Sequence, residues 1–233
     1  MDKSEVINLL EANQNERGIQ NWKKLNSHAD SLKSFGIGLT VLRKLSKKIG
    51  RDHSLAHQLW KSDIYDAKII ALLIDDPKQI TRDQVELQVD NLKHGYLAHV
   101  FSSCDATLAK TPFVVDLLED WLNSNDTMRK QCGYGLLYEV SKSKKKDAPD
   151  NAFFLQKIQK IHDTYDKEKN IILLSMGGAL LGIGKRNTIL NVAALKVAKK
   201  IGPIPVDSGI SKCEPFDVVK HLTSDYLKKK LGI

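Results

Sequence analysis

Residues 53–77, HSLAHQLWKSDIYDAKIIALLIDDP, contain the pattern that decides the fold, because they read as two short apolar helices joined by a polar turn. The first helix covers 53–60 and ends in a Leu-Trp pair. The second places its aliphatic residues along one stripe at helical spacing, namely Ile64, Ala67, Ile70, Ala71 and Ile74. It ends before Pro77, since the residue before a proline is biased away from helical backbone. The stretch therefore predicts a helical hairpin.

Similar helical segments fill the chain, and no run alternates like a β-strand. Ten or so paired helices at short spacing predict an all-α protein, an α-solenoid of HEAT or armadillo-like repeats, whose units are about 40–47 residues long. Such a stack would offer a concave, basic face. A compact all-α bundle explains the periodicity nearly as well. We expect a single domain over residues 1–233, with N-terminal helices in 1–30 and a loop with short helices in 203–233.

Composition limits the kinds of partner. The formal net charge of +8 and the pI near 9.2 favour a polyanion, although many basic proteins bind none. The N-terminus lacks a signal sequence, and no segment reaches the roughly 20 apolar residues that span a bilayer, so we expect a cytoplasmic protein without a membrane partner. The three cysteines are too few and too widely spaced for a disulfide framework or zinc cluster. No metal or cofactor is expected.

Two basic segments are candidates for contacts with phosphate. In LTVLRKLSKKIG, 39–50, an apolar stripe (Val41, Leu42, Leu45 and Ile49) faces the core, which leaves Arg43, Lys44 and Lys47 for phosphates or simply for solvent. In MGGALLGIGKRNTIL, 176–190, a nucleotide P-loop is excluded, because Ala179 replaces its first glycine and Arg186 its metal-binding hydroxyl. Lys185 and Arg186 instead fall in a turn that ends one helix, with Asn187 as the cap of the next.

Four blocks resemble one known family, the AlkD-like DNA alkylation repair proteins, which are HEAT-like repeat DNA glycosylases. The blocks lie between residues 31 and 202: FGIGLTVLRKL, HQLWKSDIYDAKIIALLIDD, DWLNSNDTMRKQCGYGLLYEV and GIGKRNTILNVAALKVAKKIG. The resemblance implies duplex DNA as the partner, alkylated or not, held by its backbone. It also implies an aspartate and aromatic residues that face the lesion.

The positions implied by the resemblance are substituted here. In KHGYLAHVFSSCD, 93–105, Gly95 falls at the aromatic position and His99 at the acid, and Asp105 is the nearest carboxylate that could replace it. Tyr96 and Phe101 are the nearest rings, and helical spacing favours the core for both. Gln131 falls at the position of an arginine, with Arg129 two residues earlier, and both are candidates for contacts with DNA. Gly178 occupies the position of a second tryptophan.

Two functions therefore stay open. The first is a DNA alkylation repair protein that binds duplex DNA and, if it is an enzyme, hydrolyses the N-glycosidic bonds of alkylpurines. The second is a catalytically silent helical-repeat scaffold for nucleic acid or a protein.

The remaining cysteine and histidine residues suggest only weaker sites. Cys213 with His221 suggests a nucleophile, or with Asp207 a metal site, but both spacings also suit a terminal loop. Four further histidines are scattered without ligand spacing and receive no role: His53, His57, His94 and His162. The sequence is compatible with a monomer and does not fix the oligomeric state.

Overall fold

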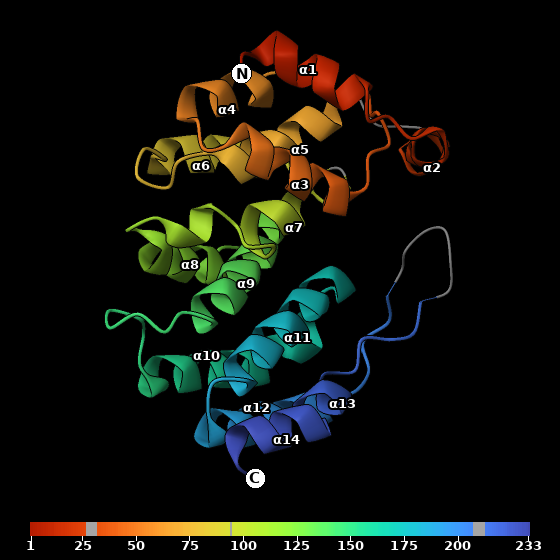
Figure 1. The fold of residues 1–233 in the computed structure, drawn as a ribbon. Coiled ribbons are helices and arrows are strands. Elements are labelled where there is room, and N and C mark those ends of the chain that lie inside the picture. Colours follow the sequence, from red (N-terminus) through yellow and green to blue (C-terminus); the bar gives the residue numbers. More distant parts are fainter. Residues whose placement is uncertain (27–31, 94, 207–212) are drawn as a thin grey trace. The chain divides into compact units, whose positions relative to one another are not determined.

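The computed structural model describes residues 1–26, 32–93, 95–206 and 213–233 (Figure 1). Within these ranges the chain forms fourteen α-helices and two 3-10 helices, and the only β pairing consists of isolated bridges. The prediction of an all-α fold is confirmed. Among the described residues, none of the helices combines the length and the apolar composition that a membrane span requires.

Contacts divide the chain into two compact units, 1–114 and 115–233. The single-domain assignment for residues 1–233 stays a prediction, and each unit is described here by itself. The first unit runs through α1 (Lys3–Glu11), α2 (Glu16–Leu25), α3 (Leu39–Ile49), α4 (His53–Trp60), α5 (Tyr65–Ile74), α6 (Arg82–Val89), α7 (Leu97–Ser102) and η1 (Leu108–Lys110).

Helix α5 is the centre of the first unit, because α1, α3, α4 and α7 all pack against it. Its residues are buried almost without interruption from Tyr65 to Ile74, which explains why the segment is apolar on nearly every side. Together α4 and α5 form the hairpin that residues 53–77 predict.

The second unit consists of α8 (Val114–Asn123), α9 (Thr127–Ser141), α10 (Asn151–Thr164), η2 (Tyr165–Lys167), α11 (Asn170–Gly184), α12 (Thr188–Ile201), α13 (Val218–Leu222) and α14 (Asp225–Leu231). Helix α11 is central and packs against α9, α12 and α13. Trp121 on α8 is buried in the core of this unit. Residues 142–150 form the loop between α9 and α10.

Polar caps explain where the helices begin. A side-chain oxygen of the N-cap residue accepts a hydrogen bond from a backbone N–H that the first helical turn leaves without a partner. Among the described residues, the N-caps that make this bond include Asp2, Asn15, Asp52, Thr81, Asp126, Asp150, Asn187 and Asp217. Substitution of one such cap by alanine typically costs about 1 kcal/mol. The caps therefore fix local helix boundaries, which is what a sequence can encode at short range.

Candidate nucleic-acid interface

Helix α3 carries an amphipathic basic surface. Leu42 and Leu45 are buried beneath it, whereas Val41, which the sequence assigned to the apolar stripe, is exposed. Lys44 and Lys47 are exposed and Arg43 is partly exposed. None of these three cations forms an ion pair with a carboxylate in the described part of the chain. We name Arg43, Lys44 and Lys47 the α3 basic face.

A buried carboxylate positions the loop that leads into α3. Asp66, in the first turn of α5, accepts hydrogen bonds from the Ser34 hydroxyl at 2.8 Å and from the backbone N–H groups of Phe35 at 2.8 Å and Ile37 at 3.1 Å. Desolvation raises the pKa of the Asp66 carboxyl, and the three hydrogen bonds oppose that change. Because Ile37 precedes α3 by two residues, Asp66 fixes where the α3 basic face begins.

The segment 95–105 departs from the arrangement that the family resemblance implies, and Gly95 shows the reason. Its φ is +53°, and a Cβ atom there would lie 2.6 Å from the hydroxyl oxygen of Tyr65. That oxygen accepts the backbone N–H of Tyr96 at 2.9 Å, and burial raises the pKa of Tyr65 to about 12. An aromatic side chain at position 95 would therefore be strained by its backbone and would clash with Tyr65.

Tyr96 and His99 lie together on the exposed side of α7. Tyr96 is 61% exposed, which corrects the expectation that it is core, whereas Phe101 is buried as expected. The two rings meet edge to face with centroids 6.4 Å apart. Although His99 is exposed by surface area, neighbouring atoms desolvate its ring, and this lowers its pKa; the charge of Arg43 lowers it further. The imidazole is therefore mainly neutral at pH 7 and lies within electrostatic reach of the α3 basic face.

Asp105, the alternative acid, is exposed and lies beyond the end of α7. Its φ is +51°, the one non-glycine residue with positive φ in the described ranges. Such a conformation is uncommon for non-glycine residues, and aspartate is among those that adopt it most readily. The roles of His99 and Asp105 in catalysis stay predictions.

The turn 184–187 in the second unit has the predicted form. Helix α11 ends at Gly184, and the Asn187 side chain accepts the N–H of Leu190 at 3.0 Å as the cap of α12. Lys185 is exposed. Its pKa is lowered mainly by desolvation and, to a smaller extent, by repulsion from the charge of Lys230. Two like charges thus approach each other, an arrangement that an anion would stabilise.

Arg186 has a different environment from Lys185, its neighbour in the turn. Its guanidinium donates hydrogen bonds to the carbonyl oxygens of Ser141 and, at 2.9 Å, Ser143. The same group lies 4.5 Å from the ring centroid of Phe154. Arg186 therefore fastens the end of α9 to the turn, and the predicted phosphate contact would have to coexist with these bonds.

The other predicted positions in the second unit are spread over α9 and α11. Arg129 is half-buried, with Nη1 3.7 Å from Oδ1 of Asp126, and Gln131 is also half-buried. Gly178 has no atom within 4 Å of where its Cβ would be, so the position of the second tryptophan is open space. The DNA contacts of Arg129 and Gln131 stay predictions.

Two further groups bear on the sequence predictions. The structure brings His53 and His57 together with Asp75, so the interpretation of these histidines as scattered was wrong. Cys213 and His221 line one cavity of about 440 Å³, but Asp207 and His94 lie outside the described residues.

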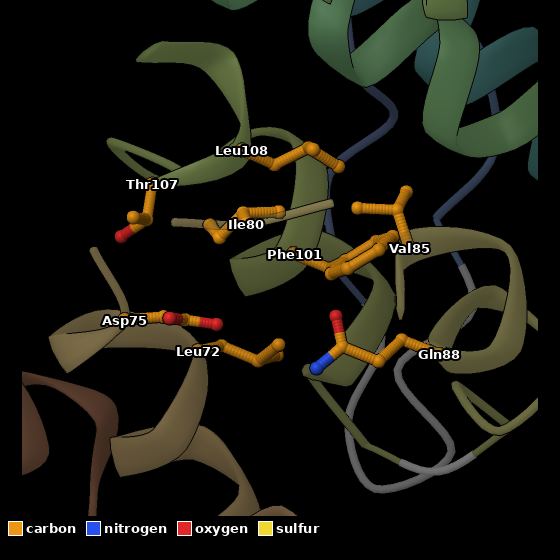
Figure 2. Close-up of a pocket in the computed structure, with 8 residues that line it drawn as sticks. All are labelled: Leu72, Asp75, Ile80, Val85, Gln88, Phe101, Thr107 and Leu108. Carbon is orange, nitrogen blue, oxygen red and sulfur yellow. The ribbon is translucent and has the colours of Figure 1, made fainter. Parts of the chain in front are cut away.

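A second cavity, next to Asp75, is lined by apolar side chains such as Leu72, Val85 and Phe101 (Figure 2). Its volume of about 10 Å³ is close to the minimum for one water molecule, which excludes a base or nucleotide. This cavity is therefore no part of the candidate interface.

Comparison with solved structures identifies the fold. One solved chain, from a family of proteins related to the HEAT-like repeat DNA glycosylases with affinity for branched DNA structures, matches all of this chain and 97% of its own length, with a TM-score of 0.80 at 21% identity. The prediction of a HEAT-like helical-repeat fold is confirmed.

Comparison of the sequence identifies the family. Residues 6–204 match the family described as DNA alkylation repair enzyme, and the protein belongs to that family. Uncharacterized proteins of Listeria innocua and Listeria monocytogenes are 23% and 24% identical over 195 residues, which cover 83% of this chain and 84% of each relative. The resemblance that the four sequence blocks carry is thereby confirmed.

Proposed function

We propose that this member of the DNA alkylation repair family binds DNA through its phosphate backbone, with the α3 basic face as a principal contact. The observation that carries the proposal is the absence of any ion pair from Arg43, Lys44 and Lys47 within the described residues. Cations without internal counter-charges can neutralise phosphates, and the counterions that DNA then releases drive binding. The basic net charge of the whole chain adds long-range attraction.

Lys185 and Lys230 form a second basic position, in the other unit, and we propose that it also meets a phosphate. Their mutual repulsion, which contributes to the lowered pKa of Lys185, would be relieved by an anion between them. Arg129 and Gln131 are further candidates for this surface, whereas the bonds of Arg186 to Ser141 and Ser143 favour a structural role. A DNA-binding role fits the cytoplasmic location that the sequence suggests.

The form of DNA is part of the proposal. The solved relative belongs to a family with affinity for branched DNA structures, and contacts with backbone phosphates do not require an uninterrupted duplex. We therefore propose both branched DNA and linear duplex DNA as ligands. Fluorescence anisotropy with a linear duplex and a four-way junction of the same length compares the two ligands. Tighter binding to the junction would identify branched DNA as the preferred ligand, tighter binding to the duplex would identify linear DNA, and equal affinity would mean that the protein does not discriminate between them.

Salt dependence tests the contact surface itself. The triple variant Arg43→Gln, Lys44→Gln, Lys47→Gln should bind more weakly, and its plot of log affinity against log salt should be shallower by about 2.7, at about 0.9 for each of three phosphate contacts. The matched control neutralises three exposed lysines elsewhere in the same unit, Lys61, Lys78 and Lys110. The proposal is wrong if both variants lose the same affinity and slope.

A second candidate function, removal of alkylated purines, is favoured by the neighbouring side chains of Tyr96 and His99. An exposed tyrosine ring can stack on a displaced base, and a neutral imidazole can accept a proton from an attacking water molecule. A purine that carries an alkyl group and a positive charge is a good leaving group, so it requires less assistance from the protein.

Mass spectrometry of bases released from methylated duplex DNA tests this activity. Release of 3-methyladenine or 7-methylguanine that is lost in His99→Gln assigns the imidazole to the reaction, and loss in Asp105→Asn assigns the carboxylate. If the protein binds the methylated DNA but releases no alkylated base, its function is DNA binding without catalysis.

A further inference from the structure

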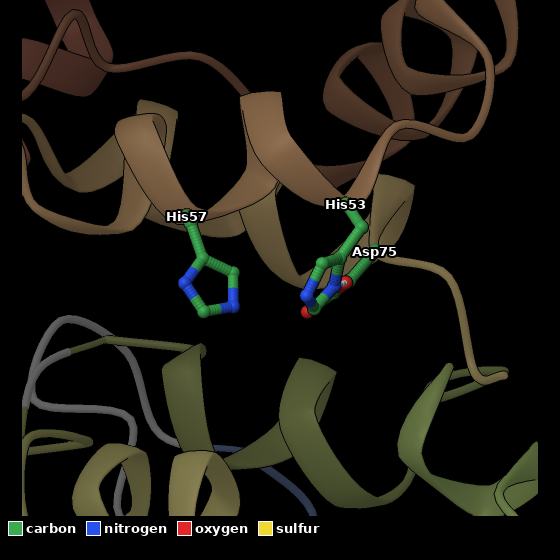
Figure 3. A group of neighbouring side chains, drawn as sticks. All are labelled: His53, His57 and Asp75. Atoms are coloured by element: carbon green, nitrogen blue, oxygen red, sulfur yellow. Dashed lines mark hydrogen bonds and ion pairs between the residues drawn. The ribbon is translucent and has the colours of Figure 1, made fainter. Parts of the chain in front are cut away.

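A cluster of two histidines and an aspartate lies on the α4–α5 hairpin of the first unit, and none of its members is among the residues proposed to contact DNA (Figure 3). His53 and His57 are one turn apart on α4, so their side chains leave the same face of the helix. Asp75 follows the last residue of α5 and is 4% exposed. The two imidazole rings have centroids 4.4 Å apart.

The contacts inside the cluster leave a buried donor atom without a partner. Nδ1 of His53 lies 2.6 Å from Oδ1 of Asp75, which satisfies both groups. Nε2 of His57 is buried and has no hydrogen-bond partner. A buried polar atom without a hydrogen-bond partner destabilises the folded state, and a ligand bound at the cluster would remove that penalty.

Asp75 is held as metal-ligating carboxylates usually are. Oδ2 accepts a hydrogen bond from the side-chain amide of Gln84 at 2.7 Å, and Oδ1 accepts the backbone N–H of Asp76 at 2.8 Å. Such outer hydrogen bonds orient a ligand and are a regular feature of metal sites. The other amide atom of Gln84, Oε1, is buried and also lacks a partner, so a second oxygen donor lies on a residue bonded to the cluster.

From this geometry we infer that His53, His57 and Asp75 bind one divalent transition-metal ion of the zinc class. Imidazole nitrogens with one carboxylate are a ligand set that Zn²⁺ accepts, and a water molecule or Gln84 Oε1 completes four-fold coordination. The ion replaces the proton that His53 and Asp75 share, and that proton passes to solvent. Hard ions such as Mg²⁺ prefer oxygen ligands and are disfavoured here.

The distances allow this coordination after small side-chain movements. The donor atoms of the three residues lie within 4.8 Å of one another. Bonds of about 2.0–2.1 Å in a tetrahedral site place ligands about 3.3 Å apart, so the widest separation closes by about 1.5 Å. His57 is only half-buried, and rotation of its side chain supplies that movement. The bound ion would join the end of α5 to α4 and stabilise the central hairpin of the first unit.

The experiment is calorimetric titration of ZnCl₂ into the full chain, purified without a histidine tag and freed of metal by a chelator. We expect one ion per chain. His57→Ala should weaken binding by at least about 10-fold, the smaller effect expected even for loss of an outer-sphere partner. This variant removes no hydrogen bond of the native structure, so it should fold, which circular dichroism verifies. His162→Ala, a histidine of the second unit beside Asp163, is the matched control and should bind as the native chain does.

Thermal unfolding gives an independent measurement, because an ion that binds only the folded state raises the midpoint temperature. Zn²⁺ should raise that temperature for the native chain and for His162→Ala, and have little effect on His57→Ala. Absence of saturable zinc uptake overturns the inference. So does uptake that His57→Ala leaves unchanged, or uptake that disappears in His162→Ala instead.

Discussion

Gly178 and Gly182 lie one turn apart on α11, and alanine should have opposite effects at the two positions. Gly178 is in the middle of the helix, has ordinary helical backbone, and has no atom within 4 Å of where a Cβ would be. Alanine there adds no clash and restricts the unfolded chain, so Gly178→Ala should raise the free energy of unfolding by about 0.5–1 kcal/mol.

Gly182 faces α9 at close range. A Cβ there would lie 2.4 Å from Oγ of Ser141, 2.7 Å from Cδ2 of Tyr138 and 3.2 Å from the Tyr138 carbonyl oxygen. Both side chains must move and the backbone oxygen blocks further approach, so Gly182→Ala should lower the free energy of unfolding by about 1–3 kcal/mol. The two variants should therefore differ by about 1.5–4 kcal/mol although their chemical change is identical.

Urea unfolding followed by far-UV circular dichroism measures the difference. Scanning calorimetry should show midpoint shifts in opposite directions, at about 2–4 °C for each kcal/mol in a chain of this size. Equal destabilisation by the two variants would refute the reasoning, since it would mean that the surface at Gly178 is covered. Equal stabilisation would mean that α9 and α11 are not in the close contact described.

Three other variants test local features. Arg186→Lys should lower the free energy of unfolding by about 1.5–3 kcal/mol in urea titrations, because lysine cannot both bond the Ser141 and Ser143 carbonyls in this geometry and stack on Phe154; unchanged stability would contradict the fastening role. Asp66→Asn should lower the free energy of unfolding by at least about 1.5–3 kcal/mol in the same assay, since an amide cannot accept all three hydrogen bonds from the loop that precedes α3. Unchanged stability would refute the role of Asp66 in positioning this loop. For His99, the folded-state pKa lies below the unfolded value of about 6.5, so the unfolded chain binds the proton first and stability falls as pH drops below about 6.5. His99→Gln should reduce that fall in melting temperature against pH, and an identical pH profile would contradict the lowered pKa.

The sequence by itself determined the helices, their ends and the family. Periodicity and capping act within a few residues, so the hairpin at 53–77, the turn at 184–187 and the cap Asn187 were all predictable. The four sequence blocks also sufficed to identify the DNA alkylation repair family.

Only the tertiary structure decided which distant side chains meet. Asp66 and Ser34 are 32 positions apart, His53 and Asp75 are 22 apart, and Arg186 reaches Ser141 over 45. Periodicity within one helix carries no information about such pairs, because they depend on how helices pack against one another. For the same reason the sequence placed Gly95 at an aromatic position without revealing that Tyr65 fills the space. Local pattern fixed the elements of this protein, and long-range contacts between them fixed its candidate sites.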